Sequence, residues 1–199
     1  MKRLFITSCG TGIGKTLVTT ALCFQQRQSA TPVTAIKPVI SGFDPADMTT
    51  DTALILKSSG VKNPTPQLMQ AISPWRYKAP LAPSMAAAKE GNPIDLNALV
   101  MFCRGCAEDN SDLVIAEGVG GVMVPLNDKH TVLDWMQALG WPAVMVTGSY
   151  LGSISHTLTA VEAVVSRGLK IAGVIVSESG EHNGQPAVPL ADTVSTLEN

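Results

Sequence analysis

One short stretch near the N-terminus, from Leu4 to Thr20, constrains this chain more than any other. Its first residues, Leu4 to Thr7, are apolar or β-branched and predict a buried strand. Glycines follow at positions 10, 12 and 14, and after Lys15 and Thr16 apolar residues recur at helical spacing. The glycines therefore stand at a turn from a strand to a helix, which is the context that a phosphate-binding loop requires.

The residues of this turn suit a polyphosphate. Glycines allow successive backbone N–H groups to converge on phosphate oxygens, and the helix that follows adds the positive end of its dipole. The ammonium of Lys15 would neutralise charge near the β and γ phosphates, and the hydroxyl of Thr16 would ligate Mg²⁺. The pattern is a variant of G-x-x-x-x-G-K-[ST], because Cys9 stands where the first glycine is expected.

Beyond this stretch, apolar strands alternate with helical patterns. We expect strands at 33–40, 111–118, 141–148 and 169–178, and helices at about 51–56, 84–89, 96–106, 132–139 and 154–167. Five prolines between Asn63 and Pro83 predict a long irregular segment there. The alternation indicates one doubly wound α/β domain, residues 1–199, with a mainly parallel sheet covered by helices on both faces.

Conspicuous polar side chains stand at the ends of the expected strands. Lys15 and Thr16 follow the first strand. Lys37 and Ser41 stand at the end of the second strand, and Glu117 stands at the end of the third. Because a doubly wound sheet binds its ligands at the carboxyl ends of its strands, we expect these side chains to converge. Glu117 would then hold the metal ion of a bound nucleotide. Lys37, which is hard to explain inside an apolar strand, would meet a polyanion.

Two further features have more than one interpretation. Asp51, at the start of an expected helix, is either another metal ligand or an acidic partner of the helix dipole. The glycines after Glu117, in the sequence EGVGG, favour close approach of the backbone to a ligand over an ordinary loop.

Composition argues against several classes of function. The net charge is −2 and no basic block occurs, so we expect no nucleic-acid partner. No apolar run approaches the roughly 20 residues that span a bilayer, and the first residues lead directly into a strand, so we expect neither a membrane span nor a signal peptide. The four cysteines, in a chain too large to need disulfides, indicate reduced thiols in a cytoplasmic protein.

Five short motifs together resemble a known family. In chain order they are TGIGKT from Thr11, KPVISG from Lys37, TTDTALIL around Asp51, EGVGG from Glu117 and LGSISH from Leu151. Along nearly all its length the chain resembles the ATP-dependent dethiobiotin synthetases, which belong to the P-loop NTPase superfamily. In that family one amine of 7,8-diaminononanoate (7,8-diaminopelargonate) takes up CO₂, ATP phosphorylates the carbamate, and the second amine closes a cyclic urea.

The resemblance implies a role for each matching residue. Lys15 and Lys37 would take part in catalysis. Mg²⁺ would be held by Thr16, Asp51 and Glu117. The nucleotide would contact Gly12, Ile13, Gly14, Lys15, Thr16, Leu17, Glu117, Gly118, Val119, Gly120, Ser177 and Glu178. The substrate would contact Thr11, Ser41, Gly152, Ser153 and Ser155, of which the last three come from the other subunit of a homodimer.

The chain departs from the family pattern at several places. Positions 8–10 read Ser-Cys-Gly where Gly-Thr-Asp is usual, and Ser177 and Glu178 stand where an Asn-Asp pair usually reads the base. Ser155 replaces a common asparagine, which predicts a weaker or water-mediated contact with the substrate carboxylate. The sequence ends at Asn199, short of the strand and loop that usually complete the base pocket. The base preference is therefore left open.

Two other functions are weighed against this one. Cobyrinic acid synthetase-like amide ligases share the loop and the fold, but they are typically longer and carry a glutaminase domain whose nucleophilic cysteine is not supplied here. A partitioning-type ATPase switch would dimerise around nucleotide without acting on a substrate. Such switches normally carry a signature lysine at the place of Gly10, and they give KPVISG no role. We therefore expect the enzyme, although the fold alone does not separate the three.

Overall fold

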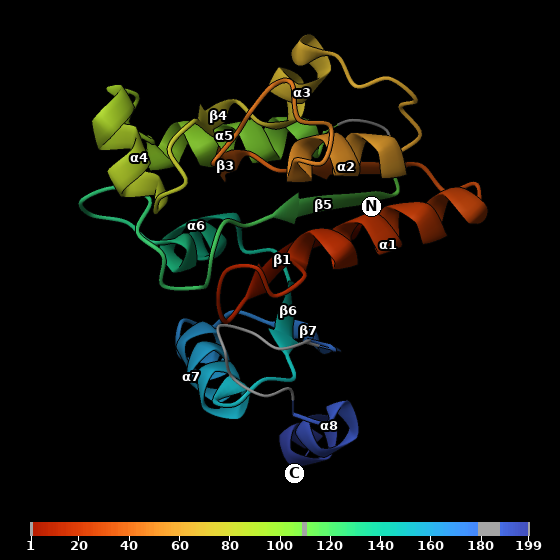
Figure 1. Ribbon diagram of the computed structural model, residues 1–199, viewed down its shortest axis with the longest axis vertical. Helices are drawn as coiled ribbons and strands as arrows, with labels where there is room; N and C mark the ends of the chain where they lie inside the picture. Colours follow the sequence, from red (N-terminus) through yellow and green to blue (C-terminus); the bar gives the residue numbers. More distant parts are fainter. Residues whose placement is uncertain (1, 109–110, 179–187, 199) are drawn as a thin grey trace.

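The computed structural model describes residues 2–108, 111–178 and 188–198 (Figure 1). A parallel sheet runs through the molecule in the strand order β2-β5-β1-β6-β7. Its strands are β1 (Lys2–Ser8), β2 (Val33–Ile36), β5 (Leu113–Glu117), β6 (Ala143–Gly148) and β7 (Ile171–Ser177). The first strand lies in the middle with later strands added on both sides, which confirms the doubly wound α/β fold.

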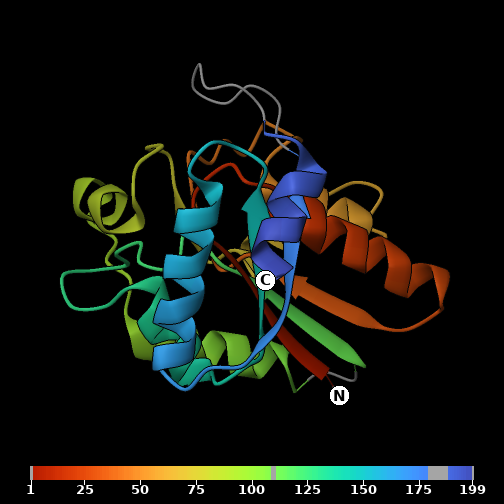
Figure 2. The same ribbon diagram turned by 90° about the horizontal axis from the view of Figure 1, so that it is seen from below.

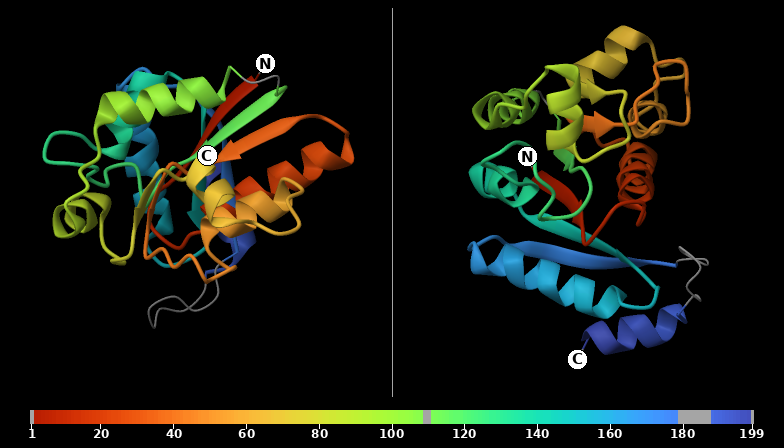
Figure 3. Two further views of the ribbon diagram at one scale, coloured as in Figure 1. Left: turned by 90° about the horizontal axis from the view of Figure 1, so that it is seen from above. Right: turned by 60° about the vertical axis from the view of Figure 1, so that its left-hand side comes forward.

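Helices cover both faces of this sheet, as Figure 3 shows in its right-hand view. The helices are α1 (Lys15–Gln28), α2 (Asp51–Ser58), α3 (Pro66–Ile72), α4 (Pro83–Glu90), α5 (Leu96–Cys106), α6 (Val132–Leu139), α7 (Ser153–Ser166) and α8 (Leu190–Glu198). Side chains of α1 and α2 pack on one face, and side chains of α5, α6 and α7 on the other. Beside the β7 edge, α8 packs against α7 (Figure 2). In the described part of the chain, no helix is long and apolar enough to cross a membrane.

The core follows from the alternation of side chains along the central strand. Phe5 points to one face, where its ring meets that of Trp135 edge-on at a centroid distance of 4.7 Å. Its neighbour Ile6 points to the other face and packs in one cluster with Val18 of α1. Every residue of β5 and β6 is buried, as the continuous apolar runs predict for strands covered on both faces.

The expected strand at 33–40 is wrong as a single element. It divides at Lys37 and Pro38 into β2 of the main sheet and β3 (Val39–Ser41), which pairs with β4 (Trp75–Tyr77) in a separate two-stranded sheet. Although β2 is an edge strand, its backbone leaves β5 here, since the Lys37 N–H donates to the Ile72 carbonyl, and Pro38 has no N–H to donate to a ladder. The break turns the Lys37 side chain toward the end of β5, where it meets Glu117.

The segment with many prolines is more regular than expected. It contains α3 and β4, so the expectation of one long irregular stretch is wrong, although no long helix forms there. Pro66 opens α3 and Pro83 opens α4, at positions where a missing N–H costs nothing. Thr65 caps α3 by accepting a hydrogen bond from the backbone N–H of Leu68. The prolines here begin helices instead of excluding them.

Candidate active site

The loop between β1 and α1 has the geometry of a phosphate cradle. Gly12 and Gly14 adopt positive φ angles of 73° and 101°, which residues with a side chain rarely adopt. Gly14 is the N-cap of α1 and brings no side chain to the helix end, so the N–H groups of the first turn stay available to a ligand. The predicted strand, turn and helix are confirmed.

A pocket of about 310 Å³ lies over this loop, where β1, β2 and β5 end. It brings together most of the residues that the sequence predicts for a site. The lining includes Thr11, Gly12, Ile13, Gly14, Lys15, Thr16, Lys37, Ser41, Asp51, Val119 and Gly120. Leu17 is not part of it, because that side chain points outward and is 65% exposed. The expected convergence at the strand ends is therefore confirmed as geometry.

Lys37 is the centre of a buried charge cluster. Its ammonium lies 2.8 Å from Glu117 Oε1 and 3.3 Å from Asp51 Oδ2, and it donates to the carbonyl of Gly118 at 2.7 Å. Lys37 and Glu117 are both buried, with 2% and 0% of their surface exposed. Burial alone would lower the pKa of Lys37, but the two carboxylates raise it above its ordinary value. The lysine is therefore held as a cation at the edge of the pocket.

Asp51 takes part in this cluster from the first turn of α2. Burial alone would raise the pKa of its carboxyl, but the Lys37 ammonium holds it below its ordinary value, so the carboxylate stays ionised. Thr50 is the N-cap of the helix and accepts a hydrogen bond from the N–H of Ala53. Asp51 stands in the first turn of α2 and also lines the pocket, so its position is compatible with both interpretations, and metal binding by Asp51 stays a prediction.

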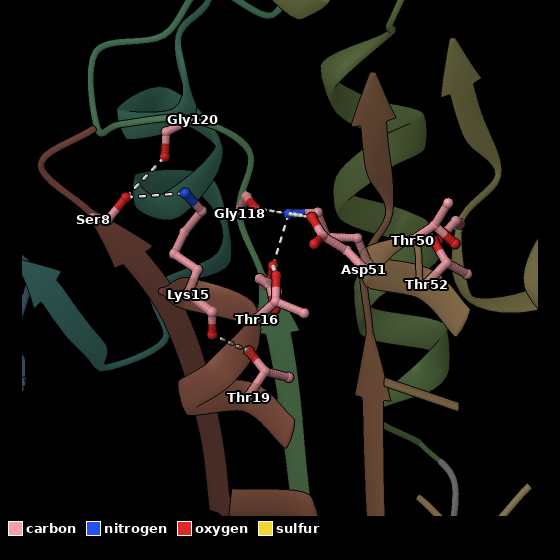
Figure 4. Close-up of polar contacts among 12 residues, drawn as sticks. Ser8, Lys15, Thr16, Thr19, Thr50, Asp51, Thr52, Gly118 and Gly120 are labelled. Atoms are coloured by element: carbon pink, nitrogen blue, oxygen red, sulfur yellow. Dashed lines mark hydrogen bonds and ion pairs between the residues drawn. The ribbon is translucent and has the colours of Figure 1, made fainter. Parts of the chain in front are cut away.

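The donor atoms at this end of the pocket fit a magnesium ion. The Thr16 hydroxyl donates to Glu117 Oε1 at 2.8 Å, while Glu117 Oε2 is buried without a hydrogen-bond partner in the described chain. Thr16 and Asp51 lie side by side in Figure 4. No group of three or more His, Cys, Asp or Glu side chains suited to a metal occurs in the described residues. A small set of oxygen ligands is what Mg²⁺ uses when phosphates complete its coordination.

Lys15 is the second buried cation. Its ammonium donates to Ser8 Oγ at 3.0 Å and to the carbonyl of Gly10 at 3.2 Å. Burial, and after it the charge of Lys37, lowers its pKa from 10.5 to about 8. Two ammonium groups face one pocket and make its potential positive. A negatively charged polyphosphate would be attracted to such a pocket.

Other predicted residues lie apart from this pocket. Gly152, Ser153 and Ser155 stand at the N-terminus of α7 and do not line it. Ser177 lies beside the loop, since a Cβ atom placed on Gly14 would be 3.2 Å from Ser177 Oγ. Glu178 follows as an exposed residue, and residues 179–187 lie outside the described part of the chain.

Sequence reasoning missed two residues of the site. Ile40 lines the pocket as its apolar wall, although it reads in the sequence only as a strand residue. Ser8, which the sequence presents only as a departure from a pattern, touches the catalytic candidate Lys15. A signal for Ser8 existed in the sequence, because a polar residue at the end of an apolar strand that is predicted to be buried usually has a hydrogen-bond partner.

Solved structures with a similar fold include cell-division proteins. The chain is similar to the septum site-determining protein MinD of Pyrococcus horikoshii complexed with Mg-ADP, with a TM-score of 0.59 and 18% identity over 99% of this chain and 77% of that one. It is also similar to the MinC:MinD cell division protein complex of Aquifex aeolicus, with a TM-score of 0.59 and 14% identity. That match covers 100% of this chain and 78% of the other. At these identities the likeness shows the fold alone.

Sequence comparisons are more specific. A family model described as an AAA domain matches residues 2–198. Three relatives carry the name ATP-dependent dethiobiotin synthetase BioD. They are those of Acidiphilium cryptum (43% identity; 89% of this chain, 80% of the relative), Methylobacterium nodulans (44%; 95% and 85%) and Caulobacter vibrioides (45%; 90% and 81%).

The Methylobacterium nodulans relative matches 95% of this chain, and the family model matches residues 2–198, which include every segment that contributes to the pocket. With 43–45% identity over most of both chains, the protein belongs to the dethiobiotin synthetase family.

Proposed function

We propose that this protein is an ATP-dependent dethiobiotin synthetase. It would convert 7,8-diaminononanoate, CO₂ and ATP into dethiobiotin, ADP and phosphate, a cyclo-ligase reaction of biotin biosynthesis. The observation that carries the proposal is the buried ion pair of Lys37 and Glu117, joined by the partly exposed Asp51, beside a phosphate loop. Membership of the family supplies the identity of the substrates.

The reaction divides into three bond changes. One amine nitrogen attacks CO₂, forms a C–N bond and loses a proton, giving a carbamate. A carbamate oxygen then attacks the γ-phosphorus of ATP as the bond to ADP breaks, giving a carbamic–phosphoric anhydride. The second amine attacks the carbonyl carbon, loses its proton and displaces phosphate, which closes the cyclic urea. None of these steps needs a covalent bond to the protein, so the work of the site is positioning and neutralisation of charge.

The residues of the pocket can position the substrates and neutralise their negative charge. The backbone N–H groups of the loop and the Lys15 ammonium would bind the phosphates. Lys37, kept protonated by its carboxylate partners, would stabilise negative charge that develops between carbamate and γ-phosphate. Thr11 and Ser41, on the same pocket wall, would orient the diamine. Thr16, Asp51 and Glu117 would hold Mg²⁺, which supplies further neutralisation of phosphate charge.

We also propose that the site is completed by a second subunit. Gly152, Ser153 and Ser155 stand at a helix N-terminus, where first-turn N–H groups lack intrahelical partners and suit the carboxylate of the substrate, although the Ser153 N–H donates to the Tyr150 carbonyl. They do not line the pocket of their own chain, so in a homodimer the partner's copy of this helix would supply the contact. Ser177 and Glu178 would lie near the base. The cytoplasmic location stays a prediction.

The proposal is tested by phosphate release from Mg-ATP and bicarbonate, with and without 7,8-diaminononanoate. We expect release to depend strongly on the diamine. Diamine-independent hydrolysis at the same rate would contradict the synthetase and favour an ATPase switch. Substituting an aliphatic monoamine acid of similar length provides a control, because it can form a carbamate and yet cannot close a ring.

A further inference from the structure

The hydroxyl of Ser8 lies directly beneath the phosphate loop. Ser8 is the last residue of β1 and has 0% of its surface exposed. Its Oγ lies 2.5 Å from the carbonyl oxygen of Gly10 and 3.1 Å from that of Gly120, and it accepts a hydrogen bond from Lys15 Nζ. Figure 4 shows dashed contacts from this side chain to Gly120 and to the end of Lys15. The hydroxyl thus joins the loop, the segment after β5 and the lysine.

The contacts of Lys15 leave one N–H direction toward the pocket. An ammonium group has three N–H bonds, and two of them are directed at Ser8 Oγ and the Gly10 carbonyl. Both acceptors belong to the start of the loop, and Lys15 itself lines the pocket. Two fixed acceptors on one side define where the third N–H points, which is the side on which a phosphate would lie.

We propose that Ser8 is a positioning residue for Lys15, whose ammonium it holds in the orientation that receives a nucleotide phosphate before the nucleotide arrives. The inference rests on the proposed nucleotide site. A lysine side chain without this acceptor would sample more rotamers, and binding would have to order it.

The test is the affinity of Ser8→Ala for Mg-ADP, measured by titration calorimetry. Ordering one long side chain corresponds to a loss of about 3- to 10-fold in affinity. In steady-state assays the KM for ATP should rise by the same factor, while kcat at saturating ATP changes less than about twofold, because bound phosphates then hold the lysine. Ser8→Gly removes the same hydroxyl without adding bulk, and it should show the same loss.

Thr7 provides a matched control on the same strand. It is buried, with 1% of its surface exposed, and its hydroxyl has no hydrogen-bond partner within the described residues. Thr7→Val removes that hydroxyl while keeping the shape, so the affinity for Mg-ADP should stay at the wild-type value. A loss in Thr7→Val equal to that in Ser8→Ala would overturn the proposal, because any change in β1 would then weaken binding.

A double substitution separates positioning from a merely structural role. In a Lys15→Met background, Ser8→Ala should cause no further loss of Mg-ADP affinity, since the residue through which Ser8 acts is gone. Equal losses in both backgrounds would overturn the positioning role and leave the nucleotide site intact. If the wild-type chain bound no Mg-ADP, both the positioning role and the proposed function would fall.

Discussion

At the scale of single residues, the most important feature of the site is that several charged side chains are buried. Lys37 and Glu117 lie 2.8 Å apart with almost no exposed surface, and Lys15 is buried nearby. Buried ions are costly unless they are paired, and breaking one buried pair leaves an uncompensated charge. The residues proposed for catalysis are therefore also residues on which folding depends.

Lys37→Met tests both roles of this lysine. We expect turnover to fall at least about 100-fold, since charge stabilisation in the transition state is lost. We also expect the free energy of unfolding to fall by about 3–5 kcal/mol, because Glu117 is left buried and unpaired. The variant Lys37→Met/Glu117→Gln should recover most of the stability in urea denaturation and none of the activity. Near-native turnover in either variant would remove Lys37 from the mechanism.

Lys15→Met is expected to stabilise the protein while weakening, without abolishing, nucleotide binding. The pKa of Lys15 falls from 10.5 to about 8 in the folded state, so the environment of the folded protein disfavours the charged ammonium form. The unfolded chain binds the proton more tightly, and unfolding takes up a proton between about pH 8 and 10.5. The contribution of Lys15 to stability thus rises with pH in this window.

The sign of this effect of Lys15 on stability can be measured by comparing Lys15→Met with the wild-type protein. Below pH 8 the variant should exceed the wild type by roughly 3 kcal/mol in the free energy of unfolding, and the gap should narrow above pH 8. Urea denaturation at several pH values measures the gap directly. A gap that is absent at neutral pH, or that widens as the pH rises, would contradict the assigned charge state.

Some of these residues are predictable from sequence and others are not. A lysine inside an apolar strand and a glutamate before EGVGG indicate a site, since neither suits a core. The contact between Ser8 and Gly120 joins positions that are 112 residues apart, so no local pattern contains it. The charge state of Lys15 depends likewise on neighbours that only the fold brings close.

At the scale of elements, the site depends on how the loop after β5 supports the phosphate loop. A Cβ atom on Gly121 would lie 3.1 Å from the carbonyl oxygen of Cys9 and 3.2 Å from the N atom of Gly10. Both neighbours are backbone atoms and cannot turn aside as a side chain does. At Gly121 the two loops therefore meet backbone to backbone, and glycine is required for this contact.

Gly121→Ala should displace the phosphate loop. We expect a lower melting temperature and weaker Mg-ADP binding, because overpacking of this kind costs about 1–3 kcal/mol. Gly105→Ala is the matched control, since Gly105 lies in α5 and a Cβ there meets no atom within 4 Å. That substitution should raise stability by about 0.5–1 kcal/mol and leave binding unchanged. Equal behaviour of the two variants in calorimetry would contradict the close contact.

The elements themselves were predicted with uneven success. Hydrophobic periodicity located the helices at 96–106 and 132–139, because their apolar faces pack on the sheet. It failed at 33–40, where the apolar residues continue across Pro38 although the pairing partner changes from β5 to β4. Pairing between distant strands depends on the whole fold, and a run of apolar residues does not specify its partner.

At the scale of the whole molecule, the doubly wound sheet brings segments from 11 to 120 into one pocket. The alternation of strands and helices predicts this arrangement, since parallel strands end at the same edge. The contribution of a partner subunit is not specified by one chain, and it stays a proposal. Complementation between inactive variants can test it.

Lys37→Met and Ser155→Glu provide the two variants. The first removes the catalytic cation, and the second places a like charge where the substrate carboxylate would bind. If each site combines both chains, mixing and subunit exchange should restore about one quarter of wild-type activity, because half the dimers are mixed and one of their two sites is intact. Native mass spectrometry verifies the exchange. No recovery in mixed dimers would place the whole site in one chain.

The synthetase function itself is tested most directly by following the carbon of CO₂ into the product. The purified protein is incubated with Mg-ATP, 7,8-diaminononanoate and isotopically labelled bicarbonate, and products are identified by mass spectrometry. We predict labelled dethiobiotin, with the label in the ureido carbonyl and one ADP formed for each molecule of product. ADP formed without labelled dethiobiotin, under conditions in which the diamine is present in excess, would contradict the account.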